Sequence, residues 1–453
     1  MAATTTAKPM LAPGPQPLFA LQNFVAFRRS PLTFLSRLAR DYGDVSHFSM
    51  PAGRHFFFIN HPDHIKDMLV TSNRKFRKSL ILQRTKRVLG EGLLTSEGEF
   101  HLRQRRLSQP AFHRQRLSGY AGTMVDYAAR LREQWRDDAV MNIHEQMMQL
   151  TLAIVGKTLF DADIESDAKD IGEAVETFMN MFGLLVVPFS EYIERLPLPA
   201  MRRLRNVRVR LDEIVYRLIR ERHESGNRDR GDLLSMLLLA QDTEGDGGSM
   251  TDLQLRDECL TIILAGHETT ANALTWTWML LSQNPEAEAE MHLELDALGG
   301  KLPGLDDLPQ LKYTEMVLAE SMRLYPPAWA IGRQALEDHH FAGFHVPKDS
   351  MILCSQWVMH KDSRYYPDPL KFLPQRWTSE AKTARPKFSY FPFGAGPRQC
   401  IGESFAWMEG VLLLATIAQQ WKLRLEPGHR IVPLPAITLR PKTGVMVRTQ
   451  RRK

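Results

Sequence analysis

The spacing of apolar residues changes twice along the chain and divides it into three stretches. Residues 43–60 alternate between apolar and polar positions on either side of the turn Pro51-Ala52-Gly53, which predicts a β-hairpin. From there to Pro326, apolar residues recur at every third or fourth position, which predicts helices. The clearest of these are Ser118–Trp135, Met147–Leu159, Ala168–Met181 and Val207–Glu224. Beyond Pro326, short apolar runs separated by prolines predict short strands and turns.

Nothing in this pattern separates the three stretches into independent domains. The polar loops at 223–232 and 242–249 are short, and the chain has no long linker, low-complexity tract or internal repeat. We therefore expect one large domain over residues 13–453, mainly α-helical with a smaller β region. Residues 1–12 are expected to form a flexible N-terminal tail.

The longest helical pattern runs from Thr251 to Asn284 and ends just before Pro285. Thr251 and Gln254 have the spacing of a capping box. A helix of this length spans roughly 50 Å, and its apolar sides predict that most of it is buried. Its centre nevertheless reads Ala265-Gly266-His267-Glu268-Thr269-Thr270, with a glycine, an acid and hydroxyl groups, all unfavourable in a buried helix. Residues that break the rules of a core indicate a functional site.

The chain has three cysteines, a low and odd number that argues against a disulfide framework and fits a reducing compartment. We interpret Cys259, in the long helix, and Cys354, in an apolar strand, as small buried side chains. Cys400 differs, because it lies in the glycine- and proline-rich loop Phe393–Gly402 and precedes a helix predicted from Glu403 to about Gln420. Free N–H groups at the helix start and the nearby charge of Arg398 favour a thiolate at this position.

Composition and charge exclude several functional classes. Hydrophobic residues make up 43% of the chain and charged residues 24%, which is ordinary for a globular protein. A net charge of +6 is too small for this length to indicate a nucleic-acid partner. The N-terminal residues lack the apolar core of a signal peptide, and no apolar run is long enough for a transmembrane anchor. We therefore predict a cytoplasmic location.

The cysteine loop resembles the heme-binding loop of the cytochrome P450 superfamily of heme-thiolate monooxygenases. It has the phenylalanine (Phe393), the spaced glycine, the basic residue two before the cysteine (Arg398) and the glycine two after it (Gly402). The resemblance covers nearly the whole chain, from about residue 13 to 448, and is closest to soluble bacterial-type members. It implies a cytochrome P450 fold, with heme b buried between the long central helix and the cysteine loop. The resemblance assigns the iron ligand to Cys400.

Two further motifs occur in the order that the family has them. Glu320 and Arg323 share one helix face, and the resemblance implies that Arg376 joins them in a buried structural triad behind the heme. The long-helix centre is similar to the family's oxygen-binding stretch. The resemblance implies that Gly266 leaves room for dioxygen beside the iron, that Thr269 hydrogen-bonds the distal oxygen and that Glu268 relays protons.

The heme propionates need cationic or hydrogen-bonding partners, and the resemblance supplies four. His101 and Arg105 match the family's aromatic-x-x-x-Arg stretch, although His101 stands where the family usually has tryptophan. A histidine still donates a hydrogen bond there, but its charge varies with pH. Arg333 and Arg398 match two further propionate arginines.

The implied activity is insertion of one oxygen atom from O2 into a small apolar substrate, such as a fatty acid, a hydrocarbon or a terpenoid-like compound. The runs 178–189 and 328–331 correspond to the family's mobile lid and pocket border, and ordinary helix packing accounts equally well for the first. The electrons would come from a separate ferredoxin or flavodoxin with its reductase. We expect this donor to dock on the following basic residues: Arg103, Arg105, Arg106, His113, Arg114, Arg116, Lys387 and Arg398.

Two alternatives stay open at this point. The first is an enzyme of the same scaffold that needs no external electrons, a peroxygenase, lyase or isomerase. The second is a non-enzymatic heme sensor. Members with either function usually lose the acid–threonine pair, whereas this chain keeps Glu268 and Thr269.

Overall fold

The computed structural model of the chain describes residues 10–19, 21–161, 171–172, 177, 198–226, 228–245 and 247–452. Its contacts group the chain into two compact units, each built from three separate segments. Unit 1 comprises residues 1–80, 328–371 and 383–399, and unit 2 comprises residues 81–327, 372–382 and 400–453. The predicted pocket segment 178–189 and most of the predicted helix Ala168–Met181 lie outside the described residues.

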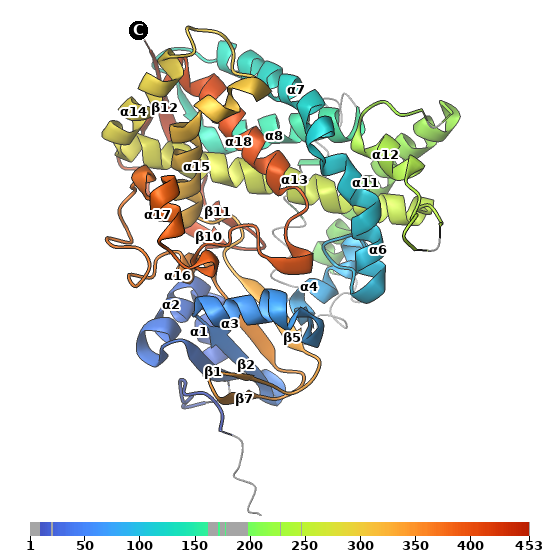
Figure 1. Ribbon diagram of the computed structural model, residues 1–453, viewed down its shortest axis with the longest axis vertical. Helices are drawn as coiled ribbons and strands as arrows, with labels where there is room; N and C mark the ends of the chain where they lie inside the picture. The colour runs from blue at the N-terminus through green and yellow to red at the C-terminus, as the bar shows by residue number, and fades with distance from the viewer. Residues whose placement is uncertain are drawn as a thin grey trace, which may run out of the picture. The chain divides into compact units, whose positions relative to one another are not determined.

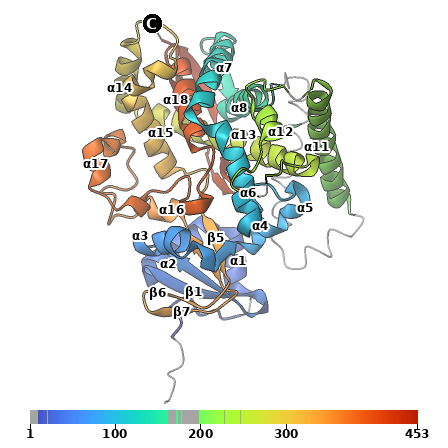
Figure 2. The same cartoon turned by 45° about the vertical axis from the view of Figure 1, so that its right-hand side comes forward.

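Unit 1 is built on a five-stranded sheet in the order β1-β2-β8-β5-β3. These strands are β1 (Val45–Met50), β2 (Arg54–Ile59), β8 (Met351–Cys354), β5 (Ile331–Ala335) and β3 (Phe76–Lys78). Figure 2 labels two strands of this sheet, β1 and β5. The predicted hairpin is confirmed, because β1 and β2 pair antiparallel around a turn at Pro51–Gly53. Strand β2 then pairs in parallel with β8, which comes almost 300 residues later in the chain.

The apolar run Phe56–Ile59 is continuous rather than alternating because both faces of β2 are covered. Phe57 and Ile59 belong to one buried cluster with Phe76 and Phe341, on one face of the sheet. Phe58 lies on the opposite face, in a cluster with residues of α2. The other elements of unit 1 are α1 (Gln22–Arg29), α2 (Pro31–Tyr42), α3 (Pro62–Lys66), α16 (Gln356–Met359), β6 (His339–Phe341) and β7 (Phe344–Val346).

Unit 2 is mainly helical, as predicted, and its centre is the long helix α13 (Asp252–Gln283) (Figure 1). The capping box forms, with Thr251 as the N-cap, and the Thr251 N–H donates to the side-chain oxygen of Gln254 at 3.0 Å. Helix α13 packs against α8 (Ile143–Phe160), α15 (Lys312–Leu324), α11 (Pro199–Glu224) and α18 (Glu403–Ala418). Because helices surround it, most residues of α13 are buried.

The remaining helices of unit 2 are α4 (Leu80–Arg84), α5 (Lys86–Leu89), α6 (Gly98–Ser108), α7 (Arg114–Glu133), α12 (Leu233–Leu239), α14 (Pro285–Asp296) and α17 (Ser379–Thr383). Two small sheets complete it, β4-β12-β9 and β10-β11, made of β4 (Val140–Asn142), β12 (Met446–Arg451), β9 (Trp421–Leu425), β10 (Pro433–Pro435) and β11 (Leu439–Pro441). None of the helices described is long and apolar enough to cross a bilayer.

Helix α11 begins eight residues earlier than its apolar spacing predicts, at Pro199 instead of Val207. The additional turns place Met201 and Leu204 three residues apart, which continues the apolar spacing, but three arginines interrupt the pattern there. Proline at the first helical position starts the helix, because its fixed φ suits that position and its missing N–H would have no partner there.

Candidate active site

Helix α13 has one accessible stretch among its buried residues. Every residue from Leu255 to Leu264 and from Thr270 to Leu281 is buried. Between them, Ala265 is exposed, and Gly266 and Thr269 are half-buried. The buried surface of α13 is therefore interrupted at this stretch. The accessible stretch coincides with the motif Ala265–Thr270, whose residues are unfavourable in a buried helix.

Thr269 belongs to this accessible stretch. Its Oγ1 donates to the Ala265 carbonyl one turn earlier, at 2.7 Å. The hydroxyl proton is therefore engaged within the helix, and the oxygen keeps its lone pairs for a further donor. A Cβ atom on Gly266 would come within 3.2 Å of the Val155 side chain of α8. This glycine therefore permits close helix packing, a role that the sequence analysis did not predict.

Glu268 is hydrogen-bonded to the turn between β10 and β11. Its Oε1 accepts a hydrogen bond from the Thr438 hydroxyl at 2.7 Å. Burial raises the pKa of Glu268, while the Thr438 hydrogen bond and the charge of Arg440 oppose that rise. Glu268 is thus a buried acid that holds its proton more strongly than an exposed glutamate does. Thr438 was missed from the sequence, because a lone threonine in a loop carries no signal.

A second buried acid lies close to the same motif. Glu409 on α18 is completely buried, and burial raises its pKa to about 8. The hydroxyl of Thr270, on α13, faces this carboxyl group and lowers its pKa somewhat. The sequence analysis overlooked Glu409. The available signal was an acid within the apolar helix Phe405–Ala418, which is the kind of rule violation that drew attention to Glu268.

Cys400 lies two residues before Gly402, the N-cap of α18. The residue is exposed by surface area, yet burial raises the pKa of its thiol to about 11. Both observations hold if the sulfur borders an enclosed space. The Gly402 N–H and the charge of Arg105 lower this pKa, as the predicted helix-start effect requires, but burial outweighs them. The thiolate predicted from the sequence therefore requires a further positive charge, such as that of a metal ion.

Helix α6 brings His101 and Arg105 to the same side, one turn apart. Buried His101 is within hydrogen-bond distance of the Ser96 hydroxyl, with 3.2 Å between Nδ1 and Oγ. Arg105 is half-buried, and burial lowers its pKa while the charge of Cys400 raises it. Two of the predicted cofactor-binding residues therefore share a helix face, and one of them interacts electrostatically with Cys400.

The other predicted cofactor-binding residues belong to unit 1. Arg333 is a half-buried residue of β5, and Phe393 and Arg398 are half-buried residues of the cysteine loop. The loop adopts a left-handed conformation at Gly396, where φ is +70°, and a Cβ atom there would lie 2.2 Å from the Leu69 carbonyl oxygen. The glycine thus lets the loop backbone pack directly on a neighbouring backbone segment.

The predicted triad of Glu320, Arg323 and Arg376 is confirmed. The Arg323 guanidinium donates to both carboxylate oxygens of Glu320 at 2.8 Å, and Arg376 Nε lies 3.3 Å from one of them. Glu320 and Arg323 are completely buried. The Trp377 indole donates to the same carboxylate at 2.9 Å and is a member of this network that the sequence analysis missed.

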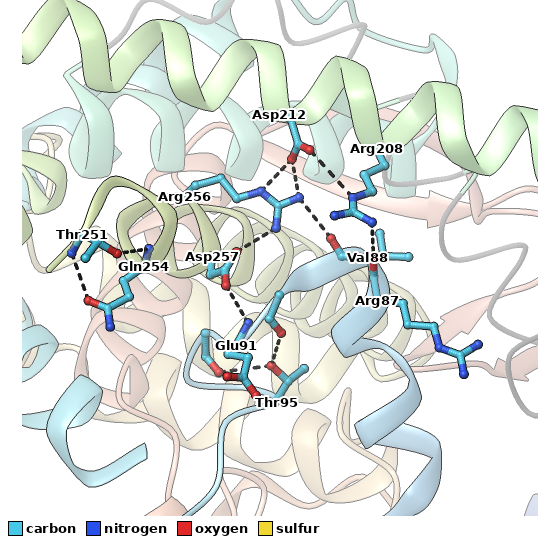
Figure 3. Close-up of polar contacts among 12 residues, drawn as sticks. Arg87, Val88, Glu91, Thr95, Arg208, Asp212, Thr251, Gln254, Arg256 and Asp257 are labelled. Carbon is cyan, nitrogen blue, oxygen red and sulfur yellow. Dashed lines mark hydrogen bonds and ion pairs between the residues drawn. The ribbon is translucent and has the colours of Figure 1, made fainter. Parts of the chain in front are cut away.

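Charged residues near the start of α13 hold the chain segment that follows α5 (Figure 3). Asp257 accepts from the Glu91 N–H at 2.7 Å, and Glu258 accepts from the Leu93 N–H at 3.0 Å. Arg256, which is buried, donates to Asp257 at 2.7 Å and to Asp212 of α11 through Nε at 2.6 Å. Residues 88–93 and helix α11 are therefore fixed to α13 by one shared network.

The comparisons with known proteins are consistent with each other. A family model described as Cytochrome P450 matches residues 12–448. Cyclooctatin synthase of Streptomyces melanosporofaciens is 37% identical over 95% of this chain and 93% of its own length. Cyclooctat-9-en-7-ol 5-monooxygenase of the same organism is 35% identical over 92% of this chain and 90% of its own. Pentalenene oxygenase of Streptomyces avermitilis is 35% identical over 91% of each chain.

Proposed function

This chain belongs to the cytochrome P450 family, and from that membership we propose that it inserts one oxygen atom from O2 into a terpenoid-like apolar substrate. As a family member, it binds heme b and is an oxidoreductase that incorporates oxygen. The proposal adds the substrate class, the residues that act and the electron donor. The observation that carries it is the position of the Cys400 thiol two residues before the N-cap of α18, where the Gly402 N–H and the charge of Arg105 both favour a thiolate.

We assign the iron ligand to Cys400. Its raised pKa favours a neutral thiol in the absence of a metal, and direct coordination to iron would remove the proton. Arg105, whose charge interacts with Cys400, would pair with a heme propionate together with His101, Arg333 and Arg398. When bound, the heme would supply the reductive activation of dioxygen, and thiolate ligation by Cys400 would favour that chemistry.

Protons have to reach the accessible stretch of α13 at Thr269. We assign their supply to Glu268, because a raised pKa makes it a better proton donor than an exposed glutamate. Its carboxyl group accepts from Thr438, so it has to turn toward Thr269, or to act through water. Thr269 would hydrogen-bond dioxygen after its hydroxyl group releases the Ala265 carbonyl.

The substrate class rests on the relatives, two of which are named for acting on cyclooctat-9-en-7-ol and on pentalenene. These names describe alkenes and alkenols with little polar surface. Among the classes that the sequence leaves open, a terpenoid-like compound is therefore favoured over a fatty acid. Residues 328–331, Ala-Trp-Ala-Ile, would border its binding pocket.

For the electron donor we propose a ferredoxin or flavodoxin with its reductase. Ion pairs within the chain reduce the basic surface predicted for its docking. Arg106 binds Asp242 through two hydrogen bonds of 3.0 and 2.9 Å, and Arg116 binds Asp229 at 2.6 Å. The remaining positive charge near Cys400 would steer an acidic donor, so the reduction rate should fall as ionic strength rises. A rate independent of salt would contradict this docking surface.

A cytoplasmic location belongs to the same proposal. All three cysteines are free thiols, which is the state expected in a reducing compartment.

Two measurements test the proposed function. The reduced, carbon-monoxide-treated holoprotein should show the red-shifted Soret band of a thiolate-ligated heme, and Cys400→Ser should lose that band. With isotopically heavy dioxygen, a ferredoxin system and a terpenoid-like alkene, the product should carry one labelled oxygen atom. Turnover without an electron donor, with peroxide alone, would favour the peroxygenase alternative instead. An unchanged Soret band in Cys400→Ser would overturn the assignment of the ligand.

A further inference from the structure

The first half of helix α11 is unusually basic. Five arginines lie within the nine residues 202–210, and no acidic residue is present in that stretch. All five are exposed: Arg202, Arg203, Arg205, Arg208 and Arg210. The second half of the same helix mixes both signs and contains the i,i+4 ion pair between Arg217 and Glu221. The positive charge is therefore concentrated at one end of α11.

The clustering of positive charge in the first half of α11 does not stabilise the helix. The N-terminus of a helix carries a partial positive charge and favours acidic side chains, but the first turn of α11 has none. Arg202, Arg205 and Arg208 are spaced three apart, so like charges are neighbours on the helix surface. Arg202, Arg203 and Arg205 form no ion pair with the residues that the structure describes. Helix stability therefore gives no reason for this composition.

Apolar side chains lie among these arginines on the same exposed stripe. Leu198 at the N-cap, Arg202, Arg205 and Val209 follow each other at intervals of four, three and four residues, which places them on one side of the helix. Leu198 is 42% exposed and Val209 is 54% exposed. A stripe that alternates aliphatic and guanidinium groups matches the boundary of a lipid bilayer, where phosphates lie beside acyl chains.

The stripe belongs to a helix that is firmly attached to unit 2 (Figure 3). Arg256 of α13 binds Asp212, one turn beyond Arg208. Arg208 in turn donates to the Arg87 carbonyl of α5 at 2.8 Å, and the exposed Arg87 side chain extends the basic surface. The arginines are thus presented by a fixed element, so binding through them does not require ordering of a flexible segment.

We propose that the first half of α11 is a peripheral binding surface for an anionic lipid bilayer. Its guanidinium groups contact headgroup phosphates, and Leu198 and Val209 enter the boundary between headgroups and acyl chains. An acidic protein would satisfy the arginines equally well but would leave the two aliphatic side chains unexplained. The proposal is independent of the proposed reaction. For an enzyme with an apolar substrate, such binding would place it where that substrate accumulates.

Sedimentation of the full-length holoprotein with lipid vesicles tests this surface. Vesicles of phosphatidylcholine containing phosphatidylglycerol should bind the protein at least tenfold more tightly than vesicles of phosphatidylcholine alone, and high salt should weaken that binding. The triple variant Arg202→Gln, Arg203→Gln, Arg205→Gln should lose at least tenfold in affinity. Val209→Ser should weaken the binding that persists at high salt.

The matched control removes the same charge at and beyond the other end of the helix, from Arg220 near its end and from Arg228 and Arg230 in the following loop. The triple variant Arg220→Gln, Arg228→Gln, Arg230→Gln should bind vesicles as the parent protein does, and melting curves should show both triple variants folded. Equal binding of the parent protein to both kinds of vesicle would overturn the proposal without any variant. It would also fail if the two triple variants lost equal affinity. Slower reduction by an acidic electron donor in the α11 variant, with unchanged vesicle binding, would assign the surface to a protein partner.

Discussion

Replacing Arg256 with methionine should destabilise the fold and loosen residues 88–93 in particular. Arg256 is buried, and its guanidinium bridges Asp212 of α11 and Asp257 of α13. Methionine fills a similar volume but leaves two carboxylates without their shared cation. The substitution therefore removes a charge from a buried network while keeping most of the packing.

The expected loss of unfolding free energy depends on the interactions that Asp212 and Asp257 keep in the variant. Removing one partner of a buried ion pair costs about 3–5 kcal/mol. Asp212 is 27% exposed and has Arg208 as a second cation at 3.8 Å, and Asp257 keeps the Glu91 N–H at 2.7 Å. Partial hydration and these remaining partners place the expected loss at the lower end of the range, about 3 kcal/mol of unfolding free energy.

Urea unfolding measures the global effect, and amide hydrogen exchange measures the local one. The N–H group of Glu91 should exchange faster in Arg256→Met, because Asp257, which accepts from it, loses the cation that holds its side chain in place. Arg222→Met is the matched control. Arg222 is another buried arginine, on α11, and it binds Asp232 and the Phe160 carbonyl without contacting residues 88–93. Arg222→Met should lower the unfolding free energy by a comparable amount and should leave amide exchange at residues 88–93 unchanged. A loss below about 1 kcal/mol in Arg256→Met, or equal exchange in both variants, would refute the reasoning.

Three further predictions concern the candidate site. Because its folded pKa of about 8 lies above the value in the unfolded chain, Glu409 contributes stability that is complete below the unfolded pKa and is lost as pH rises through 8. The advantage of Glu409→Gln over the parent in urea unfolding should therefore grow from pH 5 to pH 8, and a constant difference would contradict this. Gly396→Ala should cost at least about 2 kcal/mol and reduce heme content, whereas Gly394→Ala, which meets only a side chain at 3.6 Å, should cost less. Equal losses would contradict the close backbone contact. Thr438→Val removes the hydrogen bond to Glu268 and should raise its pKa further, shifting the pH profile of turnover upward; an unshifted profile would exclude Glu268 as the proton source.

Local patterns in the sequence were sufficient to predict the elements that depend on neighbouring residues. The hairpin at residues 43–60, the capping box at Thr251 and the helix after Cys400 all depend on spacing within a short window, and the structure confirms each of them. The Glu320–Arg323 pair was predictable for the same reason, since its two residues lie three apart on one helix. Assignment of the third member of the triad required the family resemblance.

Contacts between distant segments could not be predicted in this way. Nothing in the sequence links Asp212 to Arg256 or Glu268 to Thr438, because the two residues of each pair are far apart in the chain and belong to no shared local pattern. The burial of the Cys400 thiol could not be predicted for a related reason. The helix start and the arginines that favour a thiolate are visible in the sequence, whereas the burial that outweighs them depends on the whole fold.

The parallel pairing of β2 with β8 has a consequence for synthesis on the ribosome. Residues 54–59 leave the exit tunnel early, but their partner at 351–354 follows almost 300 residues later. At about 5–20 residues per second, the run Phe56–Ile59 waits roughly 15–60 seconds for the strand that covers one of its edges. During that interval an apolar aromatic strand with unpaired backbone N–H and C=O groups along one edge can associate with other nascent chains. Production of this protein should accordingly depend on chaperone capacity and on translation speed between the two strands.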